Sequence, residues 1–221
     1  MGYHFGATTP IPIPREVRKV SGYWPQFTPQ LGYNISYQVG ERWALQSGIT
    51  LDYKGMGVRD KVKYMYTDVL MDKDNITGYF TGKNETTVKA SYVTIPLRVA
   101  YNLTPRWEIR GGGYFSYRSS SEFSGSVWDG YIRQTTDKDQ DIVNSNKIYI
   151  QNKDEAVFDF GKEMRDYDLG VTVGFEYEFI GRFGIYGDFT YGLTPIFPSS
   201  FTGIDMKMRN IYFVLGASYR L

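Results

Sequence analysis

The stretch YVTIPLRVAYNLTPRWEIRGGGYFSYR, residues 92–118, decides the fold. Its residues alternate in character on both sides of residues 102–106, and a strand places alternate residues on opposite faces of a sheet. The odd positions carry no charge, whereas the even positions include Arg98, Glu108 and Arg110. This pattern predicts two long strands joined by a tight turn, with one uncharged face and one charged face.

The turn belongs to a unit that recurs along the chain. In each copy a Tyr is followed five residues later by an Arg, and the next residue is aromatic. The copies are YQVGERW at 37–43, YNLTPRW at 101–107 and YEFIGRF at 177–183. The chain end LGASYRL, 215–221, resembles VGFEYEF, 173–179. The sequence therefore contains an internal repeat of a hairpin unit.

The composition limits the class of protein. With 221 residues we expect a single domain, 1–221, and the balance of 25 basic against 24 acidic residues gives no reason to expect a nucleic-acid partner. Aromatic residues make up 17%, Gly is plentiful and Cys is absent, a composition typical of strands and turns without disulfides. No segment approaches the ~18 consecutive apolar residues of a membrane helix, but a closed barrel also satisfies its backbone in lipid.

The pattern predicts an eight-stranded antiparallel up-and-down transmembrane β-barrel. The expected strands are 1–9, 27–37, 43–53, 92–101, 107–118, 167–179, 183–193 and 210–221. The expected long loops are 10–26, 54–86, 119–165 and 194–208, with a hairpin of 130–135 and 147–151 inside the third. The first loop has four prolines and the second is polar and charged, so neither is expected to form ladder strands. Four long loops on one end, and three short turns with both termini on the other, are typical of an outer-membrane barrel.

The two strand faces predict what each one contacts. The odd positions of seven strands contain no Asp, Glu, Lys, Arg or His, and a Lys or Arg there would cost roughly 2–4 kcal/mol in the middle of a bilayer. The even positions carry charges of both signs, which should form a packed network because so narrow a barrel holds only its own side chains. The expected barrel-interior residues are Asp52, Arg98, Glu108, Arg110, Glu176, Glu178, Asp188 and Arg220.

A soluble barrel or sandwich also alternates, with its apolar set inside. Against it, every Lys lies in a predicted loop or at a loop-proximal strand end. Seven aromatic residues also gather at the short-turn end, as a girdle at a membrane interface would. They are Tyr37, Trp43, Tyr101, Trp107, Tyr177, Phe183 and Tyr219.

The segment YVTIPLR, residues 92–98, is similar to the Y-x-x-I-P-L segment of the small outer-membrane beta-barrel proteins of Bacteroidetes, the PorT-like or porin-family proteins. LGVTVG at 169–174, YGL at 191–193 and the closing 215–221 support the resemblance, which extends more distantly to the OmpA and OmpX barrels. It implies a location in the outer membrane of a Gram-negative bacterium, with the signal peptide already removed. The chain departs from the usual aromatic last residue, because it ends in Leu221 with Tyr219 two residues before.

We expect no enzyme, because membrane-barrel enzymes depend on a His as general base and this chain has only His4, which should face the lumen or lie at a frayed terminus. Asp137, Asp139 and Asp141 resemble the start of a calcium loop, but Ile142 stands where Gly is expected and Ile148 where Glu is expected. A solvated acidic loop is therefore the simpler interpretation. No catalytic residue, metal site or cofactor is predicted.

The functional hypothesis is a non-catalytic outer-membrane barrel that acts as a structural, binding or accessory component through its extracellular loops. The expected partners are outer-membrane lipid and lipopolysaccharide, or another outer-membrane or surface protein bound through the loops. Basic and aromatic residues of the first loop suit such contacts, although a flexible proline-rich loop explains them too: Arg15, Arg18, Lys19, Tyr23 and Trp24. The alternatives are a narrow OmpW-like transporter and a soluble lipocalin-like binder.

Overall fold

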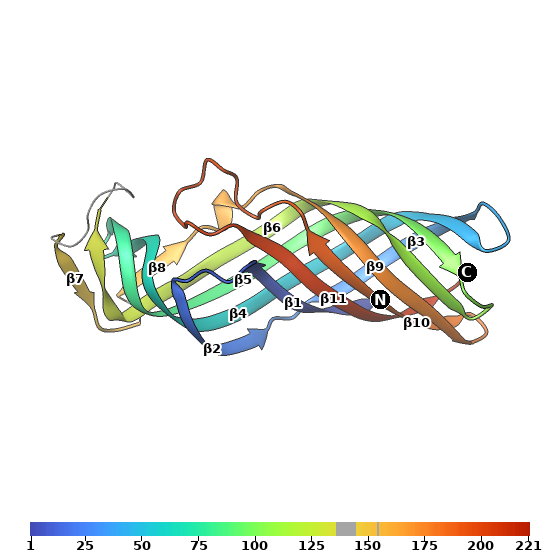
Figure 1. Cartoon of the computed structure of the whole chain (residues 1–221), viewed down its shortest axis with the longest axis horizontal. Coiled ribbons are helices and arrows are strands. Elements are labelled where there is room, and N and C mark those ends of the chain that lie inside the picture. The colour runs from blue at the N-terminus through green and yellow to red at the C-terminus, as the bar shows by residue number, and fades with distance from the viewer. Residues whose placement is uncertain (136–144, 154) are drawn as a thin grey trace.

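A computed structural model describes residues 1–135, 145–153 and 155–221. Within these ranges the chain forms eleven strands and one short 3₁₀ helix (Figure 1). The strands are β1 (Gly2–Pro10), β2 (Val17–Pro25), β3 (Pro29–Gln38), β4 (Trp43–Met71), β5 (Asp74–Asn102), β6 (Trp107–Gln134), β7 (Lys147–Ile150), β8 (Ala156–Asp159), β9 (Tyr167–Ile180), β10 (Phe183–Gly192) and β11 (Met208–Tyr219). The 3₁₀ helix is η1 (Gly161–Glu163), and no helix in the described part is long and apolar enough to span a membrane.

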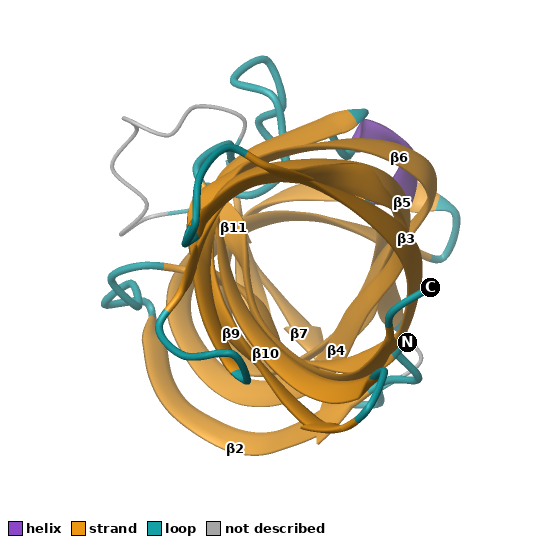
Figure 2. Cartoon of the chain, turned by 90° about the vertical axis from the view of Figure 1, so that its right-hand side faces the viewer, coloured by secondary structure: helices purple, strands orange, loops and turns teal. Residues whose placement is uncertain are grey.

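Eight of the strands close a barrel, which confirms the predicted fold. Each pairs antiparallel with its neighbour in the order β1, β11, β10, β9, β6, β5, β4 and β3. β3 then returns to β1 through the pairs Gly2↔Gln30 and Tyr3↔Pro29. The view along the axis shows the resulting ring (Figure 2).

The three short turns lie where the repeat predicts them. Residues 39–42 join β3 to β4, and residues 103–106 join β5 to β6, where the Thr104 hydroxyl accepts the backbone N–H of Trp107. Ile180 pairs directly with Phe183, so only two residues join β9 to β10. The first of these, Gly181, has φ +57°, a left-handed conformation that Gly adopts without steric cost.

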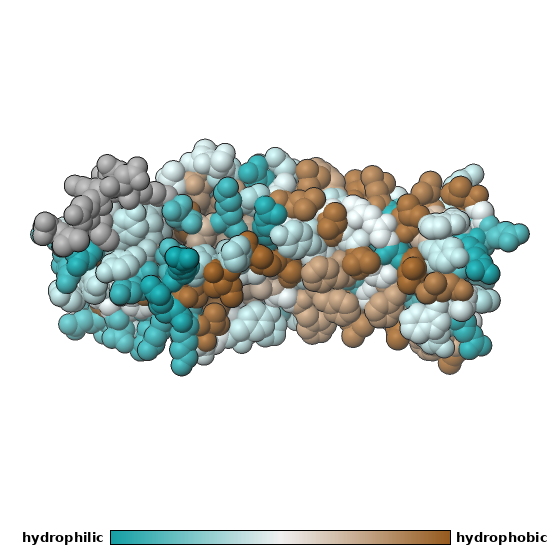
Figure 3. Space-filling model, in the orientation of Figure 1, coloured by the Kyte–Doolittle hydropathy of each residue, from teal (hydrophilic) through white to brown (hydrophobic). Residues whose placement is uncertain are grey.

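The apolar face of the barrel points outward. Leu97 is 66% exposed, whereas Arg98 beside it is 7% exposed. The same alternation holds along β4, β5, β6 and the first half of β9, and hydrophobic side chains gather over the barrel (Figure 3). The molecule therefore presents an apolar band to its surroundings and keeps its charges inside, which is the reverse of a soluble barrel.

The prediction that residues 54–86 form a loop is wrong. β4 and β5, each 29 residues long, run through this segment and pair from Trp43↔Tyr101 to Met71↔Asp74, with one register shift between Val62 and Met65. Asp72 and Lys73 form the turn between them, both at positive φ, as in the type I′ turns of hairpins. Arg59, Lys61 and Lys63, which are among the charges that suggested a loop, are exposed on the outward face of strands that have left the apolar band, whereas Lys54 and Asp60 are buried.

Two further loop predictions need correction. In the first loop, residues 17–25 form β2, which pairs with β4; the prolines cluster before β2, and Pro25 only ends it. In the third loop, β6 continues to Gln134, and β8 pairs with it. The hairpin predicted inside that loop is confirmed by the pairs Gly130↔Ile150 to Arg133↔Lys147.

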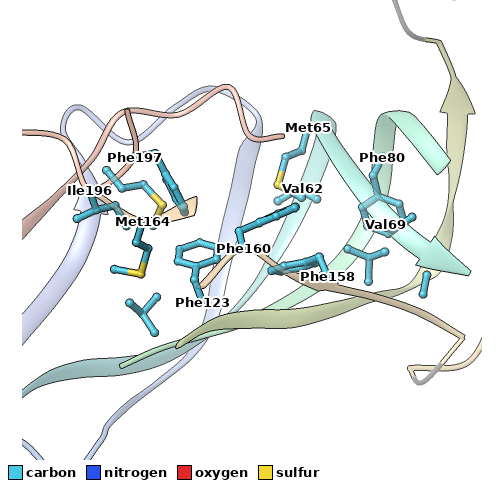
Figure 4. Close-up of a cluster of buried hydrophobic side chains, with 14 of the residues drawn as sticks. Val62, Met65, Val69, Phe80, Phe123, Phe158, Phe160, Met164, Ile196 and Phe197 are labelled. Carbon is cyan, nitrogen blue, oxygen red and sulfur yellow. The ribbon is translucent and has the colours of Figure 1, made fainter. Parts of the chain in front are cut away.

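These additions form one structure beyond the barrel, which we name the extension. It consists of residues 54–91, 118–134 and 145–163 as described, together with β2. β8 pairs with both β4 and β6, so β4, β5, β6 and β8 close a second, smaller ring. Phe123, Phe158, Phe160 and Phe197 pack inside it among Met and branched side chains (Figure 4). The extension therefore has a hydrophobic core of its own.

The two termini lie at different heights. The C-terminus is at the short-turn end, as expected, but the N-terminus lies part-way along the barrel (Figure 1). The amino group of Met1 donates to the carbonyl of Ala217 in β11, and the Met1 carbonyl accepts the Ala217 N–H. On its other side Gly2 pairs with Gln30, eight residues before β3 ends at Gln38. The expectation that both termini reach the short-turn end is therefore wrong for Met1.

Candidate functional site

The centre of the barrel lumen is a charge network built on Arg110. Its Nε and Nη2 atoms donate to the two carboxylate oxygens of Asp188 at 2.8 and 2.9 Å, and Nη1 donates to Glu176 at 2.7 Å. The guanidinium is thus held in a fork by a bidentate partner and a second carboxylate. β6, β9 and β10 supply these residues from even positions, which point inward.

Arg98 and Glu108 extend the network across β5 and β6. Arg98 lies 3.4 Å from Asp188 and donates to Asn34 at 3.2 Å, whereas its Nε atom has no partner. Glu108 lies 3.8 Å from Arg110 and accepts the side-chain amide of Gln46 at 2.8 Å. Five of the eight predicted interior residues therefore meet in one cluster.

Asp52 belongs to a separate group of lumen residues, farther from the short-turn end. It accepts from Gln30 at 2.7 Å and faces the Nε2 atom of His4 at 3.2 Å. His4 is 2% exposed, so it faces the lumen and does not fray with the terminus. Among the described residues, no hydroxyl group is hydrogen-bonded to its ring.

Glu178 and Arg220 do not belong to the interior. They form an ion pair of 3.0 Å at the rim of the short-turn end, and the Arg220 side chain is 63% exposed. Arg220 follows Tyr219, the last residue of β11, so no neighbouring strand covers it. Their even positions predict side chains that point into the barrel. The strands of the barrel end at this level, however, so the two side chains are not enclosed.

A second polar layer, which we name the septum, crosses the barrel where the extension begins. Its members are all at most 5% exposed: Thr8, Lys54, Tyr92, Tyr114, Asp168, Asn210 and Tyr212. Asp168 is the hub, because it accepts from Tyr114 at 3.1 Å and from Asn210 at 2.9 Å, and lies 3.6 Å from the Lys54 ammonium. The septum thus ties β4, β6, β9 and β11 together across the lumen.

Lys54 is held in the septum by aromatic rings. Its ammonium lies 5.1, 5.2 and 5.9 Å from the ring centroids of Tyr92, Tyr114 and Tyr212. Cation–π contact compensates a desolvated ammonium group in addition to the carboxylate of Asp168. The septum is not among the predicted interior residues, because the third predicted strand ends at residue 53, one residue before Lys54. Lys54 and Asp168 both occupy even positions, and this pattern could have indicated that they point into the barrel.

The septum separates two environments. On the short-turn side lies a cavity of about 580 Å³, lined by the charge network and by Lys54 and Tyr114. On the other side, inward positions of the same strands become apolar, beginning with Met56, Ala90 and Val88. A solute entering from the short-turn end would therefore meet first a cross-linked polar layer and then a packed hydrophobic core.

The predicted aromatic residues form a ring at the short-turn end. Three cross-strand pairs have centroids 4.6 to 5.0 Å apart: Trp43 with Tyr101, Trp107 with Tyr177, and Phe183 with Tyr219. Tyr37 is 72% exposed at the end of β3. Rings at this level bound one edge of the apolar band.

The outer face of the extension carries a cluster of the two remaining Trp residues. The Arg59 guanidinium lies 6.0 Å from the Trp24 ring and 5.9 Å from the Trp128 ring, and it bonds to Glu85 through two nitrogens. Lys153 contacts Glu85 at 2.5 Å. Burial opposes ionisation of Glu85, but its hydrogen bonds and the charges of Lys153 and Arg59 lower its pKa.

The other first-loop residues singled out in the sequence lie on or near β2. Arg18, Lys19 and Tyr23 are exposed, and the Tyr23 hydroxyl donates to the backbone carbonyl of Gly6 at 2.6 Å. Arg15 precedes β2 and is exposed. The acidic segment with Asp137, Asp139 and Asp141 lies outside the described residues.

Comparison with known proteins agrees with this architecture. The family model described as outer membrane protein beta-barrel domain matches residues 1–198. No curated protein and no solved structure matches the chain. This match indicates that the apolar band faces lipid, and it argues against the alternative of a soluble lipocalin-like binder. The chain belongs to the outer membrane protein beta-barrel domain family, and it is an integral barrel of the Gram-negative outer membrane.

Proposed function

We propose that the protein is a non-conducting, non-catalytic outer-membrane anchor that presents the extension at the cell surface as a rigid binding or accessory structure. The observation that carries this proposal is the continuity of β4, β5 and β6. Each runs from the short-turn end, through the band, into a structure with its own core. A flexible loop must become ordered when it binds a partner, which costs conformational entropy, whereas a paired sheet already presents a fixed surface.

The septum and the apolar core support the non-conducting part. Water and ions need a continuous polar path, and the inward positions beyond the septum are occupied by side chains such as Val88, Phe123 and Val127, each at most 1% exposed. The non-catalytic part is supported by the surroundings of His4. Its ring faces Asp52, and no described hydroxyl group is placed as a nucleophile beside it.

Conductance separates this proposal from the narrow-transporter alternative, which the cavity of about 580 Å³ favours. Purified protein in planar lipid bilayers should give no current steps, while a general porin in the same bilayers gives them. Tyr114→Ala, which removes a septum ring, should also be silent because the apolar core still closes the path. Reproducible steps from the unchanged protein that increase in Tyr114→Ala would favour the transporter.

Single-Cys labelling tests the orientation, because the chain has no Cys of its own. Tyr149 lies 64% exposed on β7 in the extension, and Arg182 lies in the β9–β10 turn. A membrane-impermeant maleimide should label Tyr149→Cys on intact cells and Arg182→Cys only after lysis. The opposite result would place the extension in the periplasm and contradict a surface role.

We also propose lipopolysaccharide as a partner, on the basis of cations on the outer face of the molecule beyond the lipid band. Arg18 and Lys19 lie on β2, and Arg209 on β11 is the first charged outward position beyond Ile211. The double variant Arg18→Glu/Lys19→Glu should retain less lipopolysaccharide after detergent extraction. Lys147→Glu, on β7, should retain the normal amount, and equal retention in both variants would contradict the contact.

The 92–98 segment further supports a relationship to PorT-like proteins of Bacteroidetes.

A further inference from the structure

Three lysines lie in one row across the outer face of the extension. Lys19 of β2 pairs with Lys61 of β4, Lys61 pairs with Lys83 of β5, and Lys83 pairs with Trp128 of β6. Lys19 and Lys61 are exposed, and the Lys83 side chain is 39% exposed. Directly paired residues project from the same face of a sheet, and neighbouring strands lie about 4.8 Å apart, so the three lysines leave the sheet within about 10 Å of one another. We name Lys19, Lys61 and Lys83 the lysine row.

The lysine row departs from the charge pattern around it. Like charges directly opposite one another destabilise a sheet, whereas opposite charges stabilise it. On the same strands Arg59 pairs with Glu85, and Lys89 pairs with Glu122, so nearby outward positions follow the stabilising pattern. The row therefore costs stability in the free protein, and a bound anion would remove that cost.

The row has one carboxylate beside it. Lys83 contacts Asp129 at 2.9 Å. The hydrogen bond and the charge of Lys83 lower the pKa of Asp129, and the charge of Lys61 adds to this effect, so both ammonium groups lie near that carboxylate. Across residues 1–135, 145–153 and 155–221, no carboxylate forms an ion pair with Lys19 or Lys61.

Next to the row two further cations share a single carboxylate. Arg59 and Lys153 both contact Glu85. Together with the lysine row, five cations thus contact only two carboxylates among the residues that the structure describes. The whole chain is balanced at 25 basic and 24 acidic residues, so the excess of positive charge is a property of this surface. Such a surface is complementary to a polyanion.

Two Trp side chains border the row. Trp128 ends it on β6, and Trp24 lies against the backbone of Gly57, where a Cβ atom would come within 2.1 Å of the ring. Both rings are only partly buried, and the Arg59 guanidinium lies between them. These cation–π contacts order the guanidinium before any partner binds, which lowers the entropic cost of binding. The exposed part of each ring can cover the apolar C–H face of a sugar.

We propose that the lysine row and the two Trp rings bind an acidic polysaccharide, whose chain crosses β2, β4, β5 and β6. The inference rests on the proposed surface role of the extension and names a class of partner for it. A polysaccharide with an anionic group on each repeat supplies negative charges at regular intervals, as the neighbouring strands supply ammonium groups. The ammonium group of Lys is a hydrated point charge with rotatable donors, so it suits anions that approach from several directions.

Two other occupants suit this surface less well. Protein interfaces are depleted in Lys, whereas Lys forms the row. Lipid phosphates lie at the edge of the band, and Lys61 lies eight residues beyond the band residue Tyr53 on β4. That is about 26 Å along the strand and roughly 20 Å in height at the usual tilt, so the row lies beyond the level of the lipid phosphates.

Binding of polygalacturonate, which carries one carboxylate on each sugar, tests the proposal on the whole chain folded in detergent micelles. Isothermal titration should show binding that weakens as the salt concentration rises. Poly-glutamate at the same carboxylate concentration should bind more weakly, because it offers no sugar face to the Trp rings, and neutral dextran should not bind. Lys61→Gln/Lys83→Gln should weaken polygalacturonate binding about tenfold, because two exposed ion pairs with the polymer are lost.

Two further variants complete the experiment. Lys73→Gln/Lys147→Gln removes the same charge from exposed lysines of the extension outside the row, so it should bind as the unchanged protein does. Lys61→Gln alone keeps the ion pair of Lys83 with Asp129 and relieves repulsion within the row. The extension of this variant should resist protease at least as well as before while binding weakens, which separates a loss of binding from misfolding.

Three results would overturn the proposal. One is an equal loss of binding in the two double variants, since the position of the charges would then not matter. Another is poly-glutamate binding as tight as that of polygalacturonate, which would assign the row to an acidic polypeptide. The third is binding of purified lipopolysaccharide through Lys61 and Lys83 without binding of polygalacturonate, which would assign the row to the saccharide of the membrane itself. These variants leave Arg18 and Lys19 unchanged, so failure here leaves the tests by conductance, surface labelling and lipopolysaccharide retention unaffected.

Discussion

Asp188 is the residue on which the lumen network depends. It pairs with Arg110 through both oxygens and with Arg98 at 3.4 Å, and all three side chains are buried. Removing one partner of a buried pair leaves uncompensated charge, at a cost of about 3–5 kcal/mol. Asp188→Asn should therefore lower the free energy of unfolding by about that amount, measured by urea unfolding in lipid vesicles.

The rim pair is the matched control for Asp188. Glu178→Gln removes a carboxylate of the same barrel, but its partner Arg220 is 63% exposed. Exposed ion pairs contribute about 0–1 kcal/mol, so this variant should unfold almost as the unchanged protein does. A loss of similar size in Glu178→Gln and Asp188→Asn would mean that burial in the lumen does not determine the effect.

The direction in which a strand side chain points should determine how well the barrel tolerates an Arg at that position. Leu97 points into lipid, whereas Thr94 points into the lumen, where its hydroxyl bonds to Ser116 at 2.7 Å. An Arg in mid-bilayer costs roughly 2–4 kcal/mol, so Leu97→Arg should assemble poorly. Thr94→Arg enters a cavity with carboxylates nearby and should assemble better. Heat-modifiable gel mobility measures the folded fraction, and equal fractions would contradict the assigned faces.

At the scale of elements, the β4–β5 turn is a place where the sequence is not optimal. Lys73 has φ +77°, a conformation in which a side chain is strained and Gly is not. Lys73→Gly should stabilise the extension by up to about 1 kcal/mol. Limited proteolysis of the extension should slow accordingly. Gly181→Ala, at φ +57° in the β9–β10 turn, should act in the opposite direction, and the same sign for both would contradict the argument.

The β4–β5 pair also contains a buried acid beyond the membrane, Asp60. Burial raises its pKa although Asn84 donates to it at 3.0 Å. The folded chain therefore keeps this proton to a higher pH than the unfolded chain, so stability falls as pH rises through that interval and then levels off. Asp60→Asn should stabilise the extension at pH 8 and change little at pH 3. Proteolysis rates at both pH values measure this, and an equal gain at both would exclude the titration.

At the scale of the whole molecule, the sequence predicts the part of the chain that lipid constrains. In the band every outward side chain must be apolar, so the alternation is strict and the eight strands and three turns follow from it. Beyond the band the outward face of the same strands contacts water. On β4 this face carries Leu51 and Tyr53 within the band, and Lys61 and Lys63 beyond it. The apolar set moves to the inside at Met56 and Val62, and this exchange of faces resembles a loop when read by charge alone.

The candidate site follows the same division. The pairs around Arg110 lie within predicted strands and could be anticipated, whereas Lys54 and Asp168 meet only because β4 and β9 come together across the lumen. Local spacing holds no information on that approach.

If the extension is stabilised by its own core, damage to that core should leave the barrel intact. Phe123 is 1% exposed and packs against Phe158, Phe160 and Phe197. Phe123→Ala should cost about 3–5 kcal/mol through lost burial and a residual cavity. The extension should then become sensitive to protease added outside the cell, while heat-modifiable mobility shows a folded barrel.

Phe115 on the same strand provides the control, because it faces lipid and is 44% exposed. Phe115→Ala removes the same ring without opening a cavity in the extension, so protease sensitivity of the extension should not change. If Phe123→Ala instead abolished the heat-modifiable band, barrel and extension would fold as one cooperative unit. The continuous ladder of β4, β5 and β6 would then transmit the loss of the extension's core into the membrane, and the extension could not be altered independently of the barrel.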